Sequence, residues 1–373
     1  MRFPEFSGEW YSYPLTDFMS FKNGMNPDAK RFGHGTKFIS VMDILNNQFI
    51  RYDNIRASVE VIAGDIETYG VNYGDILFQR SSETLEDVGQ ANVYLDSKPA
   101  VFGGFVIRGK SKGNYHSMFF RYLLASPTAR KRIIVKGAGA QHFNIGQDGL
   151  SKVYLDIPSI QEQEKIAKLL ECIDDRIATQ NKIIEDLNKL KSAISECIFN
   201  SIKGDVVMLS EICDIVKGKQ INGEYLSESG EYYVMNGGTE PSGYYSEYNV
   251  KANTISISEG GNSCGYVQFN NFPFWSGGHC YSLQNIADIV DNLYLYHYLK
   301  SKEEAIMKLR IGSGLPNIQK KDLAMFKTIV PPFEQQITIS TFLSSLERKA
   351  EIEERILNVM QKQKLYLLQQ MFI

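Results

Sequence analysis

The chain has 373 residues, of which 43% are hydrophobic and 22% are charged, a balance that excludes a largely disordered protein. No run of 18 apolar residues occurs and the first residues lack the apolar core of a signal peptide, so we expect a cytoplasmic protein with no membrane contact. The formal net charge of −3 argues against a broadly basic surface, so any DNA-binding region must be a local patch or be shared with a partner.

Residues 1–158 are predicted to form a mixed α/β domain. Short strand patterns bounded by glycine occur near residues 75–78 and 100–102, and a helix rich in aromatic residues is expected at 115–126. The segment carries 18 Lys and Arg residues against 16 Asp and Glu residues. Its loops contain side chains suited to base edges and phosphates. The candidate DNA-binding residues here are Lys22, Asn23, Arg80, Ser81 and Ser82.

Residues 159–203 are predicted to form a long helix. Pro158 suits a helix start, and the apolar residues that follow have the alternating spacing of three and four residues that is typical of a coiled-coil seam. These seam residues are Ile166, Leu170, Ile173, Ile177, Ile184, Leu187, Ile194 and Ile198. Two further seam positions are polar, Gln180 and Lys191.

Residues 204–331 are predicted to form a second mixed α/β domain, with a strand at 254–257 and a helix at 292–308. It carries 10 basic against 14 acidic residues. The candidate DNA-binding residues are Lys217, Lys219, Gln220, Asn236, Thr239, Ser242, Tyr244, Ser258 and Asn262. In both domains the alternative is that Gly, Asn and Ser only form turns.

An internal repeat relates the two halves of the chain. IPSIQEQ at 157–163 recurs as VPPFEQQ at 330–336, and PAVFGGF at 99–105 matches PFWSGGH at 273–279, so the offset is 173 or 174 residues. A second long helix is therefore expected at 332–373. The fold class we expect is α+β, with two mixed α/β domains in a pseudo-twofold repeat and two long helices packed as an antiparallel coiled coil.

The polar seam positions suggest a register for this coiled coil. At the repeat offset, Gln180 and Lys191 correspond to Glu353 and Lys364, and antiparallel packing then sets Lys191 opposite Glu353 and Gln180 opposite Lys364. An overlap of this length would form a rod of roughly 45 Å, longer than one turn of B-DNA at about 34 Å. The alternative is that each helix packs only on its own domain.

Catalytic and metal-binding motifs are missing from the sequence. There is no GxxxxGK[ST], HExxH or GxSxG pattern, so no catalytic residue is assigned and we expect a protein that is not an enzyme. Cys264, His279 and Cys280 resemble a partial metal site, but His279 and Cys280 are better explained as a packed pair, since Phe105 and Val106 take their places in the first repeat. No metal is expected.

The pattern resembles the specificity subunits of Type I restriction-modification systems. The resemblance covers the whole chain and rests on IPSIQEQEKIAKLL and VPPFEQQITISTFL, each a proline turn into a heptad helix, and on MNGGTEPSGY (235–244) and TISISEGGNSCGYV (254–267). It implies that residues 1–158 and 204–331 are target recognition domains, each reading one half of a split site in double-stranded DNA. The helices would set the spacing of the half-sites.

The resemblance also implies partners. Two methyltransferase subunits would dock on the helices and carry S-adenosylmethionine, while motor-nuclease subunits would complete the restriction complex; no cofactor is expected in this chain. Two other functions stay open at this point. One is a coiled-coil scaffold for protein partners without DNA binding, and the other is a detached recognition module of a larger modification enzyme.

Overall fold

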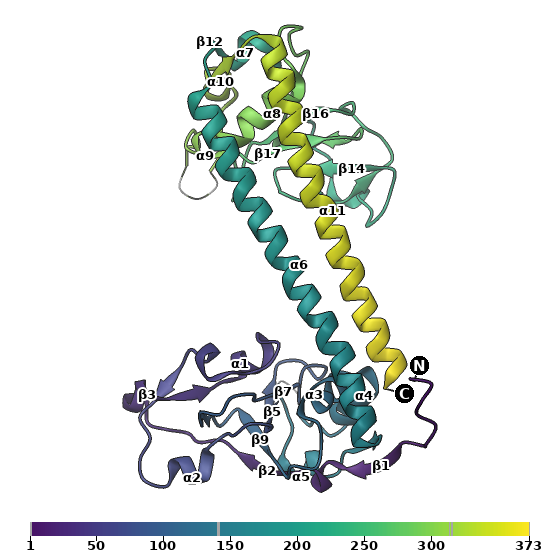
Figure 1. Ribbon diagram of the computed structural model, residues 1–373. Coiled ribbons are helices and arrows are strands. Elements are labelled where there is room, and N and C mark those ends of the chain that lie inside the picture. Colours follow the sequence, from purple (N-terminus) through teal and green to yellow (C-terminus); the bar gives the residue numbers. More distant parts are fainter. Residues whose placement is uncertain (1, 140–141, 313, 315, 373) are drawn as a thin grey trace. The chain divides into compact units, whose positions relative to one another are not determined.

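The computed structural model describes residues 2–139, 142–312, 314 and 316–372. The chain forms two compact units, Met1–Asn181 with Ile356–Ile373, and Lys182–Arg355. Each unit combines one globular domain with part of both long helices (Figure 1). The sequence-based division instead treats residues 159–203 and 332–373 as helices separate from the two domains.

The first unit contains two main sheets. In the four-stranded sheet the order is β2–β9–β5–β7, from Met19–Asn23, Val106–Ser111, Ile76–Gln79 and Ala91–Val93. In the three-stranded sheet it is β4–β3–β8, from Ser58–Val59, Phe32–Ile39 and Val101–Phe102, with β3 and β8 parallel. Two further ladders are antiparallel, β1 (Tyr11–Pro14) with β11 (Tyr154–Ile157) and β6 (Ser81–Ser82) with β10 (Phe143–Asn144). The helices are α1 (Val41–Leu45), α2 (Asp65–Tyr69), α3 (Ser117–Ala125), α4 (Pro127–Ile134) and α5 (Gln147–Ser151).

The second unit repeats this topology. Its four-stranded sheet has the order β13–β19–β16–β17, from Asp214–Lys217, Cys280–Gln284, Thr254–Ser258 and Val267–Asn270. Its three-stranded sheet has the order β15–β14–β18, from Tyr244–Tyr245, Tyr232–Met235 and Trp275–Ser276, with β14 and β18 parallel. β12 (Asp205–Met208) pairs with β20 (Lys327–Val330), and the helices are α7 (Leu209–Ile212), α8 (Asn292–Ser301), α9 (Glu303–Met307) and α10 (Lys320–Ala324). The matching strand orders confirm the repeat.

Burial accounts for the central strands, and side-chain hydrogen bonds account for the starts of two helices. All five residues of β16 are buried, which suits a strand covered on both faces. At the start of α8 the Asp291 side chain accepts from the backbone N–H of Tyr294 at 2.7 Å, and His116 caps α3 in the equivalent place. The structure has two helices where one was expected at 292–308, because α8 ends at Ser301 and α9 begins at Glu303, with Lys302 between them.

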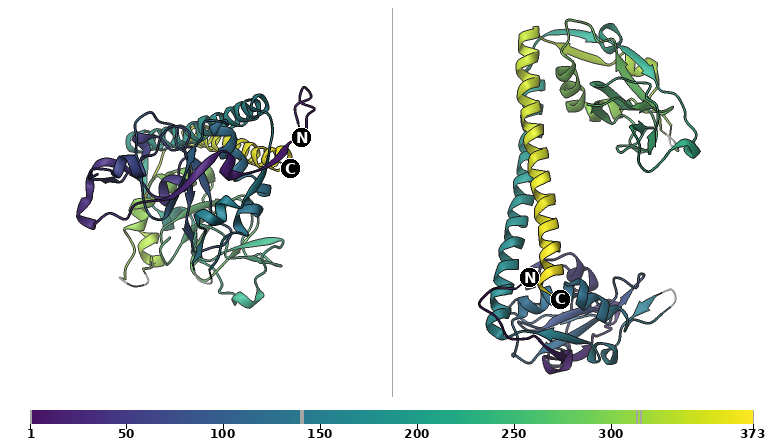
Figure 2. Two further views of the ribbon diagram at one scale, coloured as in Figure 1. Left: turned by 90° about the horizontal axis from the view of Figure 1, so that it is seen from below. Right: turned by 90° about the vertical axis from the view of Figure 1, so that its right-hand side faces the viewer.

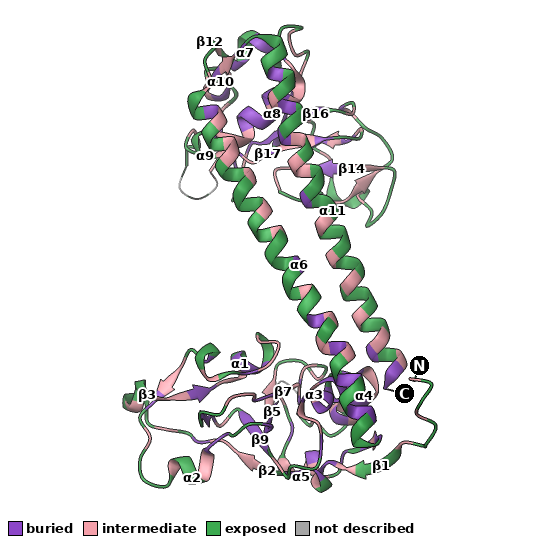
Figure 3. Ribbon diagram, viewed as in Figure 1, coloured by how far each residue is buried: buried purple, intermediate pink, exposed green. Residues whose placement is uncertain are grey.

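Two long helices, α6 (Ile160–Ser201) and α11 (Phe333–Met371), complete the units (Figure 1). In the first unit the beginning of α6, with Ile166 and Leu170, shares a core with Met371 at the end of α11. In the second unit Phe199, near the end of α6, shares a core with Leu343. The helices thus run antiparallel, as expected, and lie alongside each other within each unit in Figure 2. Figure 3 marks the buried turns that make these contacts.

The ion pairs between the helices differ from the expected register. Lys191 pairs with Glu347, with Nζ and Oε1 3.4 Å apart, and Lys364 pairs with Asp174. Each carboxylate lies six residues from the expected partner. Asp174 and Glu347 directly follow the seam positions Ile173 and Leu346, so each carboxylate lies beside the seam and not on it. These two ion pairs do not match the expected register, which set Lys191 opposite Glu353.

Candidate DNA-contacting loops

In the first unit three loops meet at one end of the strands of the four-stranded sheet, here called the loop edge. They are the segment after β2, the turn between β8 and β9, and the segment after β5. The backbone after β2 and the turn between β8 and β9 approach so closely that a Cβ on Gly24 would collide with the carbonyl oxygen of Gly103. After β5, Arg80 donates from Nη1 to the carbonyl oxygen of Gly104 at 3.2 Å. The close approach therefore requires glycine at position 24, and the loops that meet here bring Asn23 and Arg80 to one edge.

The second unit builds the same edge from the equivalent loops. A Cβ on Gly218, after β13, would collide with the carbonyl oxygen of Gly277 in the β18–β19 turn. The backbone N–H of Lys219 donates to the carbonyl oxygen of Ser276 at 2.8 Å. After β16, the backbone N–H of Glu259 donates to the carbonyl oxygen of His279 at 2.9 Å. The repeat therefore extends to the loops that carry most of the candidate residues.

The first-unit candidates are half-buried and partly held by other groups. Lys22 lies over the Tyr69 ring, with Nζ 5.4 Å from its centroid. Ser81 and Ser82 pair through their backbones with Asn144 and Phe143 as β6 and β10. Their side chains stay available at the edge, although the Ser82 hydroxyl also accepts from the backbone of Thr84 at 3.3 Å.

The second-unit candidates differ more in exposure. The exposed ones are Lys217, Lys219, Gln220, Thr239, Ser242 and Asn262, and the half-buried ones are Asn236 and Tyr244. Ser258 is only 4% exposed, and its hydroxyl donates to the carbonyl oxygen of Gly237 at 2.7 Å. Ser258 is therefore removed from the DNA-binding candidates, because it holds a neighbouring loop from inside the fold. The alternation of polar and apolar residues along β16 suggests that Ser258 lies on an exposed face, but both faces of that strand are covered.

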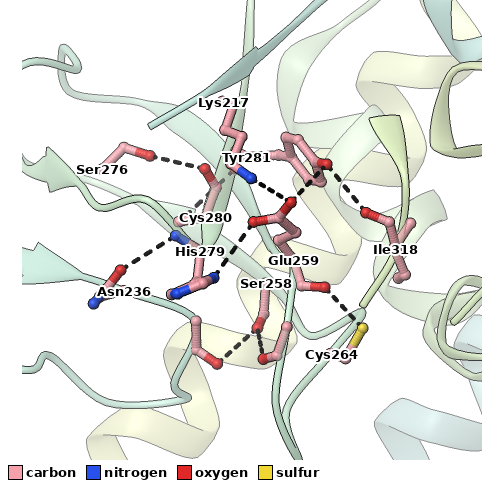
Figure 4. Close-up of polar contacts among 12 residues, drawn as sticks. Lys217, Asn236, Ser258, Glu259, Cys264, Ser276, His279, Cys280, Tyr281 and Ile318 are labelled. Carbon is pink, nitrogen blue, oxygen red and sulfur yellow. Dashed lines mark hydrogen bonds and ion pairs between the residues drawn. The ribbon is translucent and has the colours of Figure 1, made fainter. Parts of the chain in front are cut away.

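Sequence reasoning missed a cluster centred on Glu259 (Figure 4). Its Oε1 atom accepts from Lys217 Nζ at 2.5 Å and from the Tyr281 hydroxyl at 3.2 Å. Its Oε2 atom lies 3.6 Å from His279 Nδ1 and, among the residues that the structure describes, has no hydrogen-bond partner. Burial, and secondarily this carboxylate, raise the pKa of Tyr281, which keeps its hydroxyl protonated and able to donate.

His279 also corrects an expectation from the sequence. The packed-pair interpretation is right for Cys280, which is 2% exposed, but wrong for His279, whose side chain is 62% exposed. Burial raises the pKa of the Cys280 thiol to about 11, as suits an inert core cysteine. The signal for Glu259 is its place in the glycine-rich SEGGN segment, which also contains the candidates Ser258 and Asn262.

Arg80 and Glu259 occupy equivalent places with opposite chemistry. Each is the first residue after a central strand of its sheet, Arg80 after β5 and Glu259 after β16, at the loop edge. A guanidinium only donates hydrogen bonds, whereas a carboxylate only accepts them. Arg80 is half-buried and lies at the edge itself, whereas Glu259 is only 8% exposed and acts on its neighbours Lys217 and His279. The two domains therefore differ in the polar groups that this framework carries. In the described part of the chain no group of three or more His, Cys, Asp or Glu residues could hold a metal ion, and no helix is long and apolar enough to cross a bilayer.

The family model for the Type I restriction modification DNA specificity domain matches residues 7–189 and again residues 203–362. The chain belongs to this family. Recognition of DNA sequence is the role of the family, and the two matches coincide with the two copies of the repeat.

Individual relatives agree with the family match. A provisionally named type I specificity subunit of Mycoplasma pneumoniae is 33% identical over 156 residues, which are 41% of this chain and 41% of that protein. The specificity subunit of a type I restriction enzyme of Methanocaldococcus jannaschii is 22% identical over 404 residues, covering 95% of this chain and 89% of the relative.

Solved structures share the fold along the whole chain. The S subunit of a type I restriction-modification system from M. genitalium has a TM-score of 0.64 at 17% identity and covers 100% of this chain and 99% of its own. A chain from work on complex assembly and conformational transition of the type I R-M system has a TM-score of 0.61 at 15% identity, with 97% of both chains covered. The α+β fold with two domains and two long helices is thus confirmed.

Proposed function

We propose that each domain of this specificity subunit reads one half of a bipartite DNA site. The single observation that carries the proposal is the loop edge that both repeats build in the same way, with different polar side chains at equivalent places. A duplicated framework with diverged contact residues suits the recognition of two different half-sites. The near-neutral charge of the chain suits a complex in which partners supply further basic surface.

We assign base or phosphate contacts to residues of the loop edge and of the β14–β15 hairpin, which the hydrogen bond from the backbone N–H of His279 to Asn236 Oδ1 joins to that edge. They are Lys22, Asn23, Arg80, Ser81 and Ser82 in the first domain, and Lys217, Lys219, Gln220, Asn236, Thr239, Ser242, Tyr244 and Asn262 in the second. We add His279, with Glu259 as the residue that orients both His279 and Lys217. Arg80 suits guanine, Asn and Gln suit adenine, and Lys side chains and hydroxyl groups suit phosphates.

We further propose that the chain works with other subunits and performs no catalysis itself. Two methyltransferase subunits would dock on the long helices and bind S-adenosylmethionine, and motor-nuclease subunits would complete the complex in the cytoplasm, where the DNA is. Exposed apolar residues along α11 support docking there: Phe342, Ile352, Ile356, Val359 and Tyr366. Several large apolar side chains that are exposed on one helix indicate a surface that a protein partner covers.

The proposal is tested by co-expressing the chain with a methyltransferase subunit of a Type I system, taken from beside its gene where one is encoded there, and mapping methylated adenines across the genome. We expect a bipartite motif, and Arg80→Ala should relax the motif at one position of one half, by about 1–3 kcal/mol of discrimination. Arg51→Ala is the matched control, because Arg51 is an exposed arginine beside the Ile50–Tyr94 bridge, at the opposite end of β5. An unchanged motif for Arg80→Ala would remove Arg80 from the contacts.

A further inference from the structure

A three-residue polar contact joins the first domain to both long helices. The Tyr122 hydroxyl, on α3, donates to Oδ2 of Asp174 on α6 at 2.8 Å, and Lys364 of α11 pairs with Oδ1 of the same carboxylate. Lys364 also lies over the Tyr122 ring, with Nζ 5.9 Å from its centroid. The Asp174 side chain is 5% exposed, so the carboxylate depends on these two donors in place of water.

The second unit contains the same contact with different residues. The Tyr296 hydroxyl, on α8, donates to Oε1 of Glu347 at 3.3 Å, and Lys191 Nζ lies 3.4 Å from that oxygen. At the repeat offset, Tyr296 corresponds to Tyr122, Glu347 to Asp174, and Lys364 to Lys191. The long helices exchange roles, since the acid lies on α6 in the first unit and on α11 in the second.

Apolar packing alone would not fix the domain on the helix pair. Side chains of similar size at seam positions tolerate small shifts along a helix, whereas a carboxylate that must meet two donors from two elements has one satisfactory position. Burial is the largest cause that raises the pKa of both tyrosine hydroxyls, so each stays protonated and donates. Both copies keep the contact although their lysines and acids come from different helices.

We propose that the tyrosine–carboxylate–lysine contact, here called the clamp, is a positioning device that sets the orientation of each recognition domain on the helix pair. The spacing between half-sites then depends on the clamps as well as on helix length. The dependence of the spacing on the clamps rests on the proposed function, whereas the orientation of each domain on the helix pair does not. The clamp residues touch no DNA in this account.

The orientation is tested without DNA by measuring a distance between two spin labels. Cysteines replace Tyr73 in the first domain and Glu164 on α6, both exposed, in a background with the exposed Cys172 and Cys197 changed to serine. We expect Lys364→Met to broaden the distance distribution about twofold or more, because the domain loses its fixed position. Lys362→Met, an exposed lysine of the same helix, should leave the width unchanged.

A milder variant guards against unfolding, because Lys364→Met leaves a buried carboxylate without its cation. Tyr122→Phe removes only the hydroxyl and should broaden the distribution to a smaller extent. Equal widths in the wild type and both clamp variants would overturn the proposal. A stabilising contact without a positioning role would lower the unfolding temperature and leave the width unchanged, and that outcome also contradicts it.

The DNA consequence is tested separately in the second unit with charge exchange. Lys191→Glu should make methylation tolerate more than one spacer length, and adding Glu347→Lys should restore the single length. Lys189→Met, which breaks the exposed pair with Glu185, is the matched control. A single spacer length throughout would refute the DNA consequence, whereas the lack of any bipartite motif in the wild type would refute the proposed function and leave the distance result standing.

Discussion

Replacement of Gln336 by leucine should destabilise the second unit far more than a conservative change in size suggests. The Gln336 side chain is fully buried at the start of α11. Its Nε2 atom donates to the carbonyl oxygens of Pro331 at 2.8 Å and Ile289 at 3.0 Å, and its Oε1 atom accepts from the backbone N–H of Asp291 at 2.8 Å. The residue therefore ties the proline turn, the start of α11 and the cap of α8 together.

The size of the effect follows from these three hydrogen bonds. Leucine has a similar volume, so the main loss is about 1 kcal/mol per bond, or about 3 kcal/mol in total. For a unit of this size that corresponds to a fall of roughly 6–12 °C in unfolding temperature. The repeat equivalent, Gln163, makes two such bonds, to Pro158 at 3.0 Å and from His116 at 3.0 Å, so Gln163→Leu should cost about 2 kcal/mol.

Urea unfolding and differential scanning calorimetry of the full chain measure these losses. Gln335→Leu is the matched control, since Gln335 is the exposed neighbour, and it should change the free energy of unfolding by less than about 0.5 kcal/mol. If Gln336→Leu proved as harmless as Gln335→Leu, the assignment of this glutamine as a structural link would be wrong.

Three further outcomes are expected. Glu347→Lys places like charges beside Lys191 and should lower the free energy of unfolding by about 1 kcal/mol, more than Glu354→Lys at an exposed site; equal losses would argue against the observed pair. Burial, opposed by Glu347 and Asp291 and aided by Lys191, lowers the pKa of His297 below 6.5, so its neutral form favours folding. The stability that it contributes is present above the unfolded-state pKa and lost as the pH falls through the folded-state pKa. Urea titrations at about pH 8 and about pH 5.5 should therefore show a smaller change in the free energy of unfolding between the two pH values for His297→Gln than for the wild type. An equal change in both proteins would contradict this. Glu259→Gln should loosen Lys217 and His279 and change base preference only in the half-site read by the second domain, and a methylation map that changes in neither half or in the other half would reject its orienting role.

The fold was predictable where a pattern repeats along the sequence. The heptad spacing from Ile166 to Ile198 and its recurrence after VPPFEQQ indicated two long helices, and the order of the anchors indicated duplication. The ion pairs were not predictable from the same pattern. Lys191 and Lys364 pair with acids just beside the seam that also accept from Tyr296 and Tyr122, and those tyrosines come from domains whose position the heptads do not encode.

The loop edge was predictable in part. Glycine-rich loops with polar side chains were found from residue type, but the structure buries Ser258, the last residue of β16, and exposes Asn262 in the loop that follows. The SEGGN loop was a signal for Glu259, but the sequence did not show that Glu259 meets His279, because their proximity depends on the β18–β19 turn meeting the end of β16. Residue type suggests which side chains suit DNA, whereas the fold decides which of them reach the surface together.

Exchange of the first domain tests the central claim most directly. Residues 1–158 are replaced by the equivalent domain of a family member with a different target, and methylated adenines are mapped for the complex with the methyltransferase subunits. We predict a bipartite motif in which one half changes to that of the donor while the other half and the spacer stay the same. A motif that changes in both halves or in neither, or a complex that does not bind DNA, would contradict the account.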